Sequence, residues 1–159
     1  MIKGQISVTW TEQDYKSLQY DDVDKVVGRS DYAVNTDNYN VAVSSVFKNL
    51  PQVFHNAVKF LNLKKVVVAV NRMIPEQILP FHTDKYKTYK KRNNIADIDE
   101  ITRVIIFLHD QKAGHQLWIK DKVCVGPAGS CFGWSKGVEH MAANFGNEDR
   151  YILQVTGIK

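Results

Sequence analysis

Long apolar runs are absent from this 159-residue sequence. A membrane-spanning helix needs about 20 predominantly apolar residues, and a secretory signal peptide contains a shorter apolar run near its start. The chain instead begins Met1-Ile2-Lys3-Gly4-Gln5 and continues into polar sequence. We therefore expect a cytoplasmic protein with no membrane partner.

Cysteine and proline are also scarce. The two cysteines, Cys124 and Cys131, are too few for a cysteine-rich zinc site, and we interpret them as reduced packing residues. Four prolines, 44% hydrophobic residues and 24% charged residues are ordinary for a globular protein and unlike a disordered one. We expect a single domain over residues 1–159.

Several catalytic motifs are missing as well. The sequence has no Gly-rich phosphate loop, no Ser/His/Asp arrangement and no nucleophile elbow. Hydrolase and nucleotide-dependent functions therefore have no support.

The net charge of +4 is unevenly distributed. Residues 1–63 contain six Lys and Arg against seven Asp and Glu, whereas residues 64–159 contain fifteen against ten. The second portion thus carries all of the positive excess, which favours an anionic partner there, such as a small molecule or an acidic peptide. The basic residues are not regularly interleaved with aromatic ones, so nucleic acid is not favoured.

The first 63 residues predict a mixed α/β support. Alternating apolar residues indicate a strand over residues 5–10, and Thr11 with Asp14 could cap a short helix. Residues 21–40 are rich in turn-forming residues and are interpreted as connecting structure. After Pro51, apolar residues recur at helical spacing over residues 52–61, which makes this the best predicted helix.

From residue 64 onward, the pattern changes to short strands. β-branched residues dominate, and the apolar period falls to two or to brief continuous runs separated by glycines and prolines. The predicted strands are residues 65–73, 78–82, 101–108, 116–119, 122–125, 130–134, 138–144 and 151–156. This density of short strands favours a sandwich or barrel over an alternating βαβ sheet.

Two histidines and one aspartate form the strongest constellation in the sequence. His82 and Asp84 are two residues apart, so on a strand they would point to the same face. His140 lies in a later strand-like segment that could lie beside the first. Two histidines and one carboxylate are the ligands of facial-triad Fe(II) sites. Each element alone is common, and a histidine in a strand is often a core residue, but in combination they predict a metal site.

Arg150 follows His140 by ten residues, at the start of the next predicted strand. Its planar, permanently charged guanidinium suits a carboxylate. A metal site that is open to a bidentate co-substrate needs such a counter-charge.

These motifs, in this order, resemble the 2-oxoglutarate/Fe(II) oxygenase superfamily over roughly residues 65–157. The resemblance rests on Pro80-Phe81-His82-Thr83-Asp84, on residues 103–108, on His140 and on residues 150–157. It implies a mostly β protein with an N-terminal helix, in which residues 64–159 form a double-stranded β-helix, or cupin-like jelly roll. It also implies that His82, Asp84 and His140 bind Fe(II), and that Arg150 binds the 5-carboxylate of 2-oxoglutarate.

Within the superfamily, the sequence most resembles small stand-alone forms from bacteria and their viruses, related to prolyl and aspartyl/asparaginyl hydroxylases. The latter share an arginine at the position of Arg103, but their best-known members lack the carboxylate that Asp84 supplies. Prolyl hydroxylases keep the carboxylate but commonly have lysine at the position of Arg150. Because the chain departs from each pattern at one position, the resemblance does not identify the substrate.

The resemblance implies a hydroxylase that consumes O2 and 2-oxoglutarate, releases succinate and hydroxylates a C–H bond of a prime substrate, with ascorbate as a candidate reductant. Peptidyl Pro, Asn or Asp, a free amino acid and a nucleic-acid base all stay open as prime substrates. Two other functions also stay open: a cupin-like metalloenzyme that does not use 2-oxoglutarate, and a non-enzymatic jelly-roll binding module.

Other residues are candidates for contacts around the metal. Arg103 could bind the co-substrate or could pair with an acidic neighbour such as Asp99 or Glu100. Asn144 lies an even number of residues from His140 and so would share its face, which makes it a candidate substrate contact. Trp134 could line the site, although packing in the core is its simpler role.

A basic segment follows Asp84 directly. Residues 85–92 contain five basic residues and two tyrosines, Tyr86 and Tyr89. We interpret the segment as a solvated loop. The alternative is a mobile lid that covers the metal and recognises an acidic peptide or a phosphate backbone, with the tyrosines stacking on the substrate. The remaining histidines, His55, His109 and His115, are interpreted as structural.

Overall fold

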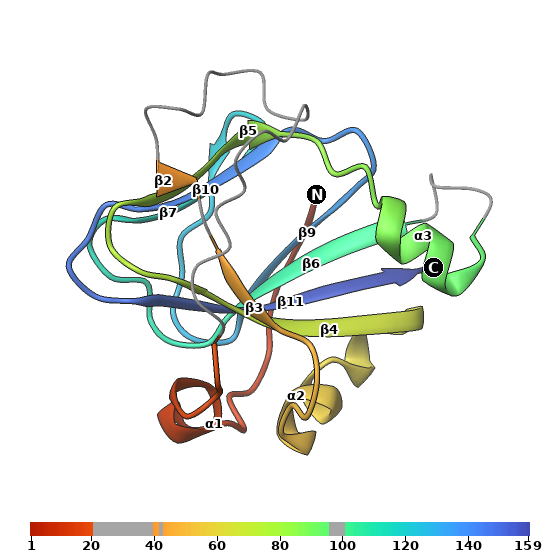
Figure 1. The fold of residues 1–159 in the computed structure, drawn as a ribbon, viewed down its shortest axis with the longest axis horizontal. Helices are drawn as coiled ribbons and strands as arrows, with labels where there is room; N and C mark the ends of the chain where they lie inside the picture. The colour runs from red at the N-terminus through yellow and green to blue at the C-terminus, as the bar shows by residue number, and fades with distance from the viewer. Residues whose placement is uncertain (21–39, 42, 96–100) are drawn as a thin grey trace.

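The strands form two facing sheets, with the helices of residues 12–16 and 52–57 on one side of them and the helix of residues 87–93 at another (Figure 1). The computed structural model describes residues 1–20, 40–41, 43–95 and 101–159. The larger sheet has the strand order β1-β9-β6-β11-β4-β3, and the smaller sheet has the order β2-β5-β10-β7-β8. All paired strands are antiparallel except β2 with β5. This arrangement is the predicted jelly roll.

The elements have the following bounds. The larger sheet comprises β1 (Ile2–Gln5), β9 (Ser130–Ser135), β6 (Ile101–Phe107), β11 (Arg150–Ile158), β4 (Lys64–Met73) and β3 (Ser44–Val46). The smaller sheet comprises β2 (Asn40–Val41), β5 (Gln77–His82), β10 (His140–Asn144), β7 (His115–Ile119) and β8 (Lys122–Val123). The helices are α1 (Glu12–Lys16), α2 (Gln52–Ala57), the 3-10 helix η1 (Lys59–Leu61) and α3 (Lys87–Asn93). None of these helices, within the described ranges, is long and apolar enough to cross a membrane.

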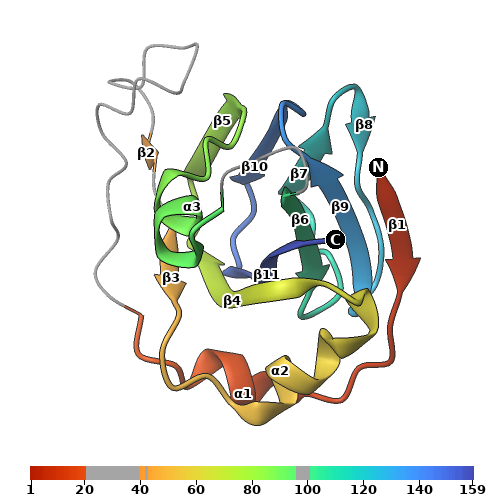
Figure 2. The ribbon, with the colours of Figure 1, turned by 90° about the vertical axis from the view of Figure 1, so that its right-hand side faces the viewer.

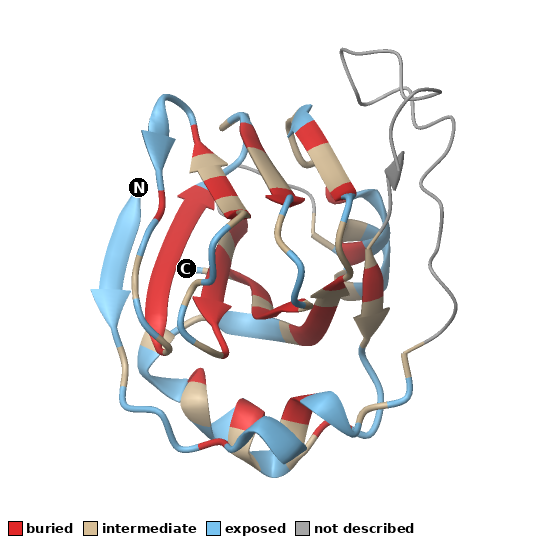
Figure 3. Ribbon diagram, turned by 90° about the vertical axis from the view of Figure 1, so that its left-hand side faces the viewer, coloured by how far each residue is buried: buried red, intermediate tan, exposed pale blue. Residues whose placement is uncertain are grey.

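The larger sheet buries both of its faces. Residues that alternate along a strand point to opposite faces, so β11 contributes Leu153 to one hydrophobic cluster and Ile152 to another. The outer cluster contains Phe54 of α2 and Tyr15 of α1, and these two helices lie beneath β4 in Figure 2. The inner cluster lies between the two sheets. Figure 3 shows this burial in the central strands, while β1 forms an exposed edge.

The strand predicted over residues 5–10 is wrong in its position. The observed strand β1 ends at Gln5, because the chain then turns away from β9 after one further hydrogen bond, from the Ile6 N–H to the Gly129 carbonyl. Trp10 turns into the outer cluster instead, where its indole N–H donates to the Leu108 carbonyl at 2.7 Å. The predicted short helix after Thr11 is confirmed as α1.

Other boundaries differ from the sequence pattern. The helix predicted over residues 52–61 is divided into α2 and η1, and left-handed Asn62 ends it. The solvated loop predicted for residues 85–92 is wrong, because residues 87–93 form α3. The short strands β2 and β3 were not predicted. The connecting structure predicted for residues 21–40 lies outside the described residues except at Asn40.

Candidate metal centre

His82 and His140 occupy directly opposed positions on adjacent antiparallel strands. His82 is the last residue of β5, and His140 is the first residue of β10 and pairs with it. Asp84 lies two residues beyond β5, in the connection to α3, rather than on the strand itself. One ligand atom from each of the three side chains lies within 4.8 Å of the others. The folding of β5 against β10 therefore brings together the three predicted metal ligands.

Backbone hydrogen bonds orient both imidazole rings. The Nδ1 atom of His82 lies 2.7 Å from the Pro80 carbonyl, and that of His140 lies 3.0 Å from the Val138 carbonyl. A carbonyl can only accept, so each Nδ1 carries a proton, and in the neutral ring the lone pair is on Nε2. Metal-binding histidines are commonly oriented by such a bond from the nitrogen that does not bind the metal.

The Asp84 carboxylate lies between a histidine and an arginine. Its Oδ2 is 3.6 Å from His140 Nε2, and its Oδ1 is 3.6 Å from Arg103 Nη2. Burial raises the pKa of Asp84, but the positive charge of Arg103, with the two histidines, outweighs burial and lowers the pKa below its usual value. Asp84 is therefore ionised at neutral pH, as a metal ligand must be.

The buried His140 is neutral at physiological pH. Burial is the main cause that lowers its pKa to about 4, although the Asp84 carboxylate acts in the opposite direction. The Trp134 ring packs against the His140 ring with a centroid distance of 4.3 Å, and the His82 ring lies at the same centroid distance on β5. The unprotonated imidazole and the ionised carboxylate are both ready to bind a cation.

These donors fit a metal ion. Asp84 Oδ2 is buried and makes no hydrogen bond within the described part of the chain, although a buried oxygen without a partner is costly. A cation held by this oxygen and by imidazole nitrogens would satisfy it. The two-histidine, one-carboxylate set suits Fe(II) and similar divalent ions, and it leaves coordination positions open.

Arg103 on β6 contacts the centre through Asp84. Asp99 and Glu100 lie outside the described residues, whereas the Arg103–Asp84 ion pair is formed. The Arg103 guanidinium also stacks on the Tyr86 ring, with 5.2 Å from Cζ to the ring centroid. Its Nε has no hydrogen-bond partner among the described residues.

Arg150 lies on the inner face of the larger sheet, away from these contacts. It is 5% exposed, and its Nη1 donates to the Met73 sulfur at 3.6 Å. Burial lowers its pKa to about 10, so it keeps its charge at neutral pH. It forms no salt bridge with a carboxylate in the described ranges.

Asn144 and Trp134, the two predicted lining residues, have different surroundings. The Asn144 amide is fully buried and donates to the carbonyls of Met73 and Glu148, while its Oδ1 accepts from the Gly146 N–H. These bonds use its polar atoms in the turn after β10. Trp134 Nε1, by contrast, is buried without a partner among the described residues, beside His140.

Sequence reasoning missed two polar residues of the barrel interior. Asn71 of β4 donates from its amide to Gln154 of β11 at 3.1 Å, and Asn71 Oδ1 has no partner among the described residues. Gln154 shares the inner face of β11 with Arg150 and Ile152, because the three residues alternate along the strand. The sequence signal that could have revealed both residues is a polar residue inside an otherwise apolar strand, as in Val70-Asn71 or Leu153-Gln154-Val155.

The buried histidines outside the centre have structural contacts. His109 Nδ1 donates to the Asp110 carbonyl, and His109 Nε2 accepts from the Tyr151 N–H at 3.1 Å. His115 donates through Nε2 to the Glu148 carbonyl at 3.0 Å and accepts at Nδ1 from the Lys112 N–H. The side-chain nitrogens of both residues are thus occupied by backbone groups.

Comparison with known proteins relates the chain to solved structures only. No protein-family model matches the sequence, and no curated protein matches it. A prolyl-4-hydroxylase from Pseudomonas putida superposes with a TM-score of 0.55 at 14% identity, over 74% of this chain and 71% of that one. A predicted oxalate decarboxylase from Thermotoga maritima gives 0.48 at 16% identity, over 76% and 89%. The cupin domain of Schizosaccharomyces pombe Cnp3 gives 0.45 at 12% identity, over 74% and 64%.

The chain has a cupin-type jelly-roll fold. At these identities the likeness concerns the fold alone, so the chemistry has to be argued from the side chains themselves.

Proposed function

We propose that this protein is an Fe(II)- and 2-oxoglutarate-dependent oxygenase that hydroxylates a C–H bond of a prime substrate. The observation that carries the proposal is a buried arginine, Arg150, that faces the interior of a jelly roll in which His82, Asp84 and His140 converge. The triad accounts for a metal, and the arginine accounts for an anionic co-substrate.

The argument for the co-substrate is electrostatic. Moving a charged guanidinium out of water costs roughly several kcal/mol of free energy unless an anion compensates the charge. Among the described residues, Arg150 contacts the weak acceptor Met73 Sδ and pairs with no carboxylate. A dicarboxylate such as 2-oxoglutarate could place one carboxylate on Arg150 while its oxo-acid end reaches the metal.

The polar groups of the interior extend this proposal. Asn71 Oδ1 and Trp134 Nε1 are buried without partners in the described part of the chain, on strands that line the interior. Trp134 can donate a hydrogen bond and Asn71 can accept one. A bound polar co-substrate, or the water it brings, would satisfy both atoms.

His82, Asp84 and His140 would hold Fe(II), which supplies oxygen activation coupled to decarboxylation of 2-oxoglutarate. Arg103 would keep Asp84 ionised and would hold Oδ1, so that Oδ2 faces the metal. The Trp134 ring would shield His140 from water. The apolar inner cluster, which includes Ile119 and Ile152, would exclude solvent from the interior. The balanced reaction converts R–H, O2 and 2-oxoglutarate into R–OH, succinate and CO2.

The test is an anaerobic titration of the protein with Fe(II) and 2-oxoglutarate. We expect a visible charge-transfer band that needs both components. The His82→Ala variant should lose the band, because the metal site is incomplete. Arg150→Gln should keep the band but require roughly 10- to 100-fold more 2-oxoglutarate, since a charged hydrogen-bonding partner is lost. Absence of the band from the wild-type protein would refute the proposal.

A cupin-like metalloenzyme that does not use 2-oxoglutarate is the second candidate. The observation that favours it is the His82–Asp84–His140 cluster itself, because this donor set can hold Fe(II) or a similar divalent ion whether or not 2-oxoglutarate is bound. In this case the wild-type protein would bind Fe(II) with micromolar or tighter affinity, and 2-oxoglutarate would change neither the spectrum nor the metal affinity. A non-enzymatic binding module that has kept the ligands would show no charge-transfer band and would release no succinate from 2-oxoglutarate.

A further inference from the structure

Helix α3 begins three residues after the metal ligand Asp84 and is fastened to the barrel by its tyrosines. Tyr89 is buried, and its hydroxyl donates to the Lys65 carbonyl at 2.9 Å. Lys65 Nζ in turn donates to the Asn93 carbonyl at 2.8 Å, at the other end of the helix. Tyr86 packs with Tyr89 and Ile101 in a small hydrophobic cluster and contacts Arg103.

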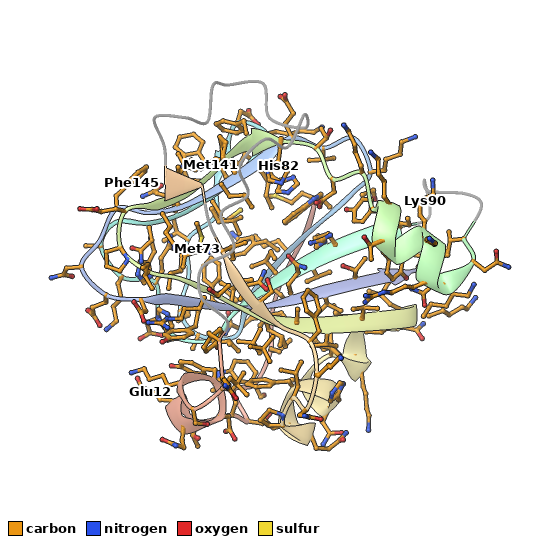
Figure 4. All side chains as sticks on the ribbon, in the orientation of Figure 1. Glu12, Met73, His82, Lys90, Met141 and Phe145 are labelled. Carbon is orange, nitrogen blue, oxygen red and sulfur yellow. The ribbon has the colours of Figure 1, made fainter. Side chains whose placement is uncertain are left out.

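The charged residues on the outer surface of α3 are therefore all basic. Both tyrosines face inward, and the helix sequence Lys-Thr-Tyr-Lys-Lys-Arg-Asn contains no acidic residue. Lys87, Lys91 and Arg92 are exposed, and Lys90 is half-buried. These four cations, which we call the α3 basic surface, form no salt bridge with any described carboxylate. Figure 4 shows Lys90 on α3 at the right of the view, with His82 in the upper sheet.

The opposite side of the metal centre has no such excess. There, Lys120 and Lys122 flank Asp121 after the strand that pairs with His140, and Lys136 precedes Glu139 in the β9–β10 connection. All five side chains are exposed, so acidic residues offset most of the positive charge. The positive potential beside the centre is thus concentrated on the α3 side.

We propose that the prime substrate is a protein segment in which acidic residues lie next to the residue that is modified, and that their carboxylates dock on the α3 basic surface. This inference rests on the proposed oxygenase function and adds the substrate class. Lysines on a rigid helix attract carboxylates and steer their approach. The residue between the carboxylates would then lie beside Asp84, at the start of the same segment.

Two observations favour an acidic peptide over nucleic acid. Single-stranded nucleic acid is commonly bound by exposed aromatic rings that stack on bases, and both tyrosines of the segment are buried. The basic surface is also short, because a helix of seven residues is roughly 10 Å long. A short acidic stretch can follow such a surface, whereas a nucleic-acid backbone calls for a longer positive groove.

The sequence also places Asp97, Asp99 and Glu100 shortly after α3, outside the described residues. Any experiment should therefore use the full chain, which contains these carboxylates as well as the α3 basic surface.

Binding is measured by fluorescence anisotropy on the full-length protein, with a labelled peptide in which glutamates flank a central proline. The matched peptide has glutamine at each glutamate position, and a labelled single-stranded oligonucleotide is the third probe. We expect the acidic peptide to bind most tightly and to weaken as salt is added. Equal binding of the glutamine peptide, or tighter binding of the oligonucleotide, would overturn the inference.

Charge reversal locates the interaction. Lys87→Glu combined with Lys91→Glu should raise the Kd of the acidic peptide roughly tenfold or more, because two attractions become repulsions. Lys48→Glu combined with Lys59→Glu makes the same charge change at exposed positions on the side of α2 and η1, and should have a much smaller effect. If the two double variants lose equal affinity, α3 is not the docking surface.

The binding readout is independent of turnover. Peptide-dependent succinate formation is measured separately. Selective peptide binding through α3 without succinate formation would contradict the oxygenase function while leaving the docking surface intact. Succinate formation with the glutamine peptide but not with the glutamate peptide would contradict the acidic specificity while supporting the oxygenase function.

Discussion

One hydrogen bond decides the protonation of each of His109 and His115. His109 accepts from the Tyr151 N–H, and His115 accepts from the Lys112 N–H. A protonated ring would direct an N–H at each of these N–H donors, so both residues require the neutral form. Burial is the main cause that lowers the pKa of both histidines, and the Arg150 charge acts in the same direction.

Acidification should therefore destabilise the protein. The unfolded chain takes up protons on these histidines near pH 6.5, while the folded chain resists until a lower pH, so stability falls as pH drops below about 6.5. We expect a lower urea midpoint at pH 5.5 than at pH 7.5. In His115→Gln this loss should be smaller. A midpoint that does not change between the two pH values would show that the folded protein accommodates the charged rings.

The residues of the candidate metal centre were predictable from residue type, but their surroundings were not. His82, Asp84 and His140 form a known donor set in a predictable order. No local pattern relates Arg103 to Asp84, because helix α3 lies between the two residues in the sequence. The role of Asn144 in its turn likewise depends on its distance from Met73, which lies 71 residues away in the sequence.

At the scale of elements, the helices differ in how far the local sequence specifies them. α1 has its own start signal: the Asp14 carboxylate accepts from the N–H and the hydroxyl of Thr11, at 2.7 and 2.9 Å. α3 has no side-chain cap, and its first flanking residue, Tyr86, adopts a left-handed conformation. Its contacts with Lys65 and Ile101 stabilise it instead. This difference explains why α1 was predicted and α3 was interpreted as a loop.

Removal of the α1 cap measures how much the capping hydrogen bonds contribute to the free energy of unfolding. Asp14→Ala should reduce the free energy of unfolding by about 1 kcal/mol, because the first turn loses its capping partner. Chemical denaturation provides the measurement. Asp14→Asn, which keeps an acceptor oxygen, should retain most of the stability. Equal losses in the two variants would mean that the carboxylate charge, rather than the bond, stabilises the turn.

At the scale of the whole molecule, β11 contributes residues to both hydrophobic cores, the outer cluster beneath the larger sheet and the inner cluster between the sheets. Leu153 packs in the outer cluster with the helices, and its neighbour Ile152 packs between the sheets, in the compartment that Arg150 faces. Leu153→Ala and Ile152→Ala should each cost about 2–5 kcal/mol of unfolding free energy.

The same two variants should differ in ligand binding. Ile152→Ala is expected to weaken 2-oxoglutarate binding, because it enlarges the interior, whereas Leu153→Ala should leave the affinity nearly unchanged in protein that remains folded. Denaturation and the anaerobic titration together provide the two measurements. Loss of affinity in Leu153→Ala alone would contradict the separation of the two cores.

The architecture was predictable only up to its class. Short β-rich segments separated by turn residues indicated a sandwich or barrel, because that pattern depends on neighbouring residues. The sequence suggested that the His140 strand could lie beside the His82 strand, but the registers of β10 with β5 and β7 could not be predicted, since registers across separate strands depend on distant packing. The register with β5 is what brings His140 opposite His82.

The continuity of Asp84, Tyr86 and α3 has a thermodynamic consequence. A ligand that docks on α3 would share one short stretch of backbone with the carboxylate that is proposed to bind the metal, so occupancy of either site should bias the conformation of the other. Such coupling is reciprocal: if the acidic peptide tightens metal binding by some factor, the metal must tighten peptide binding by the same factor. Through the polypeptide between residues 82 and 93, binding of the substrate would then change the affinity of the centre for its metal.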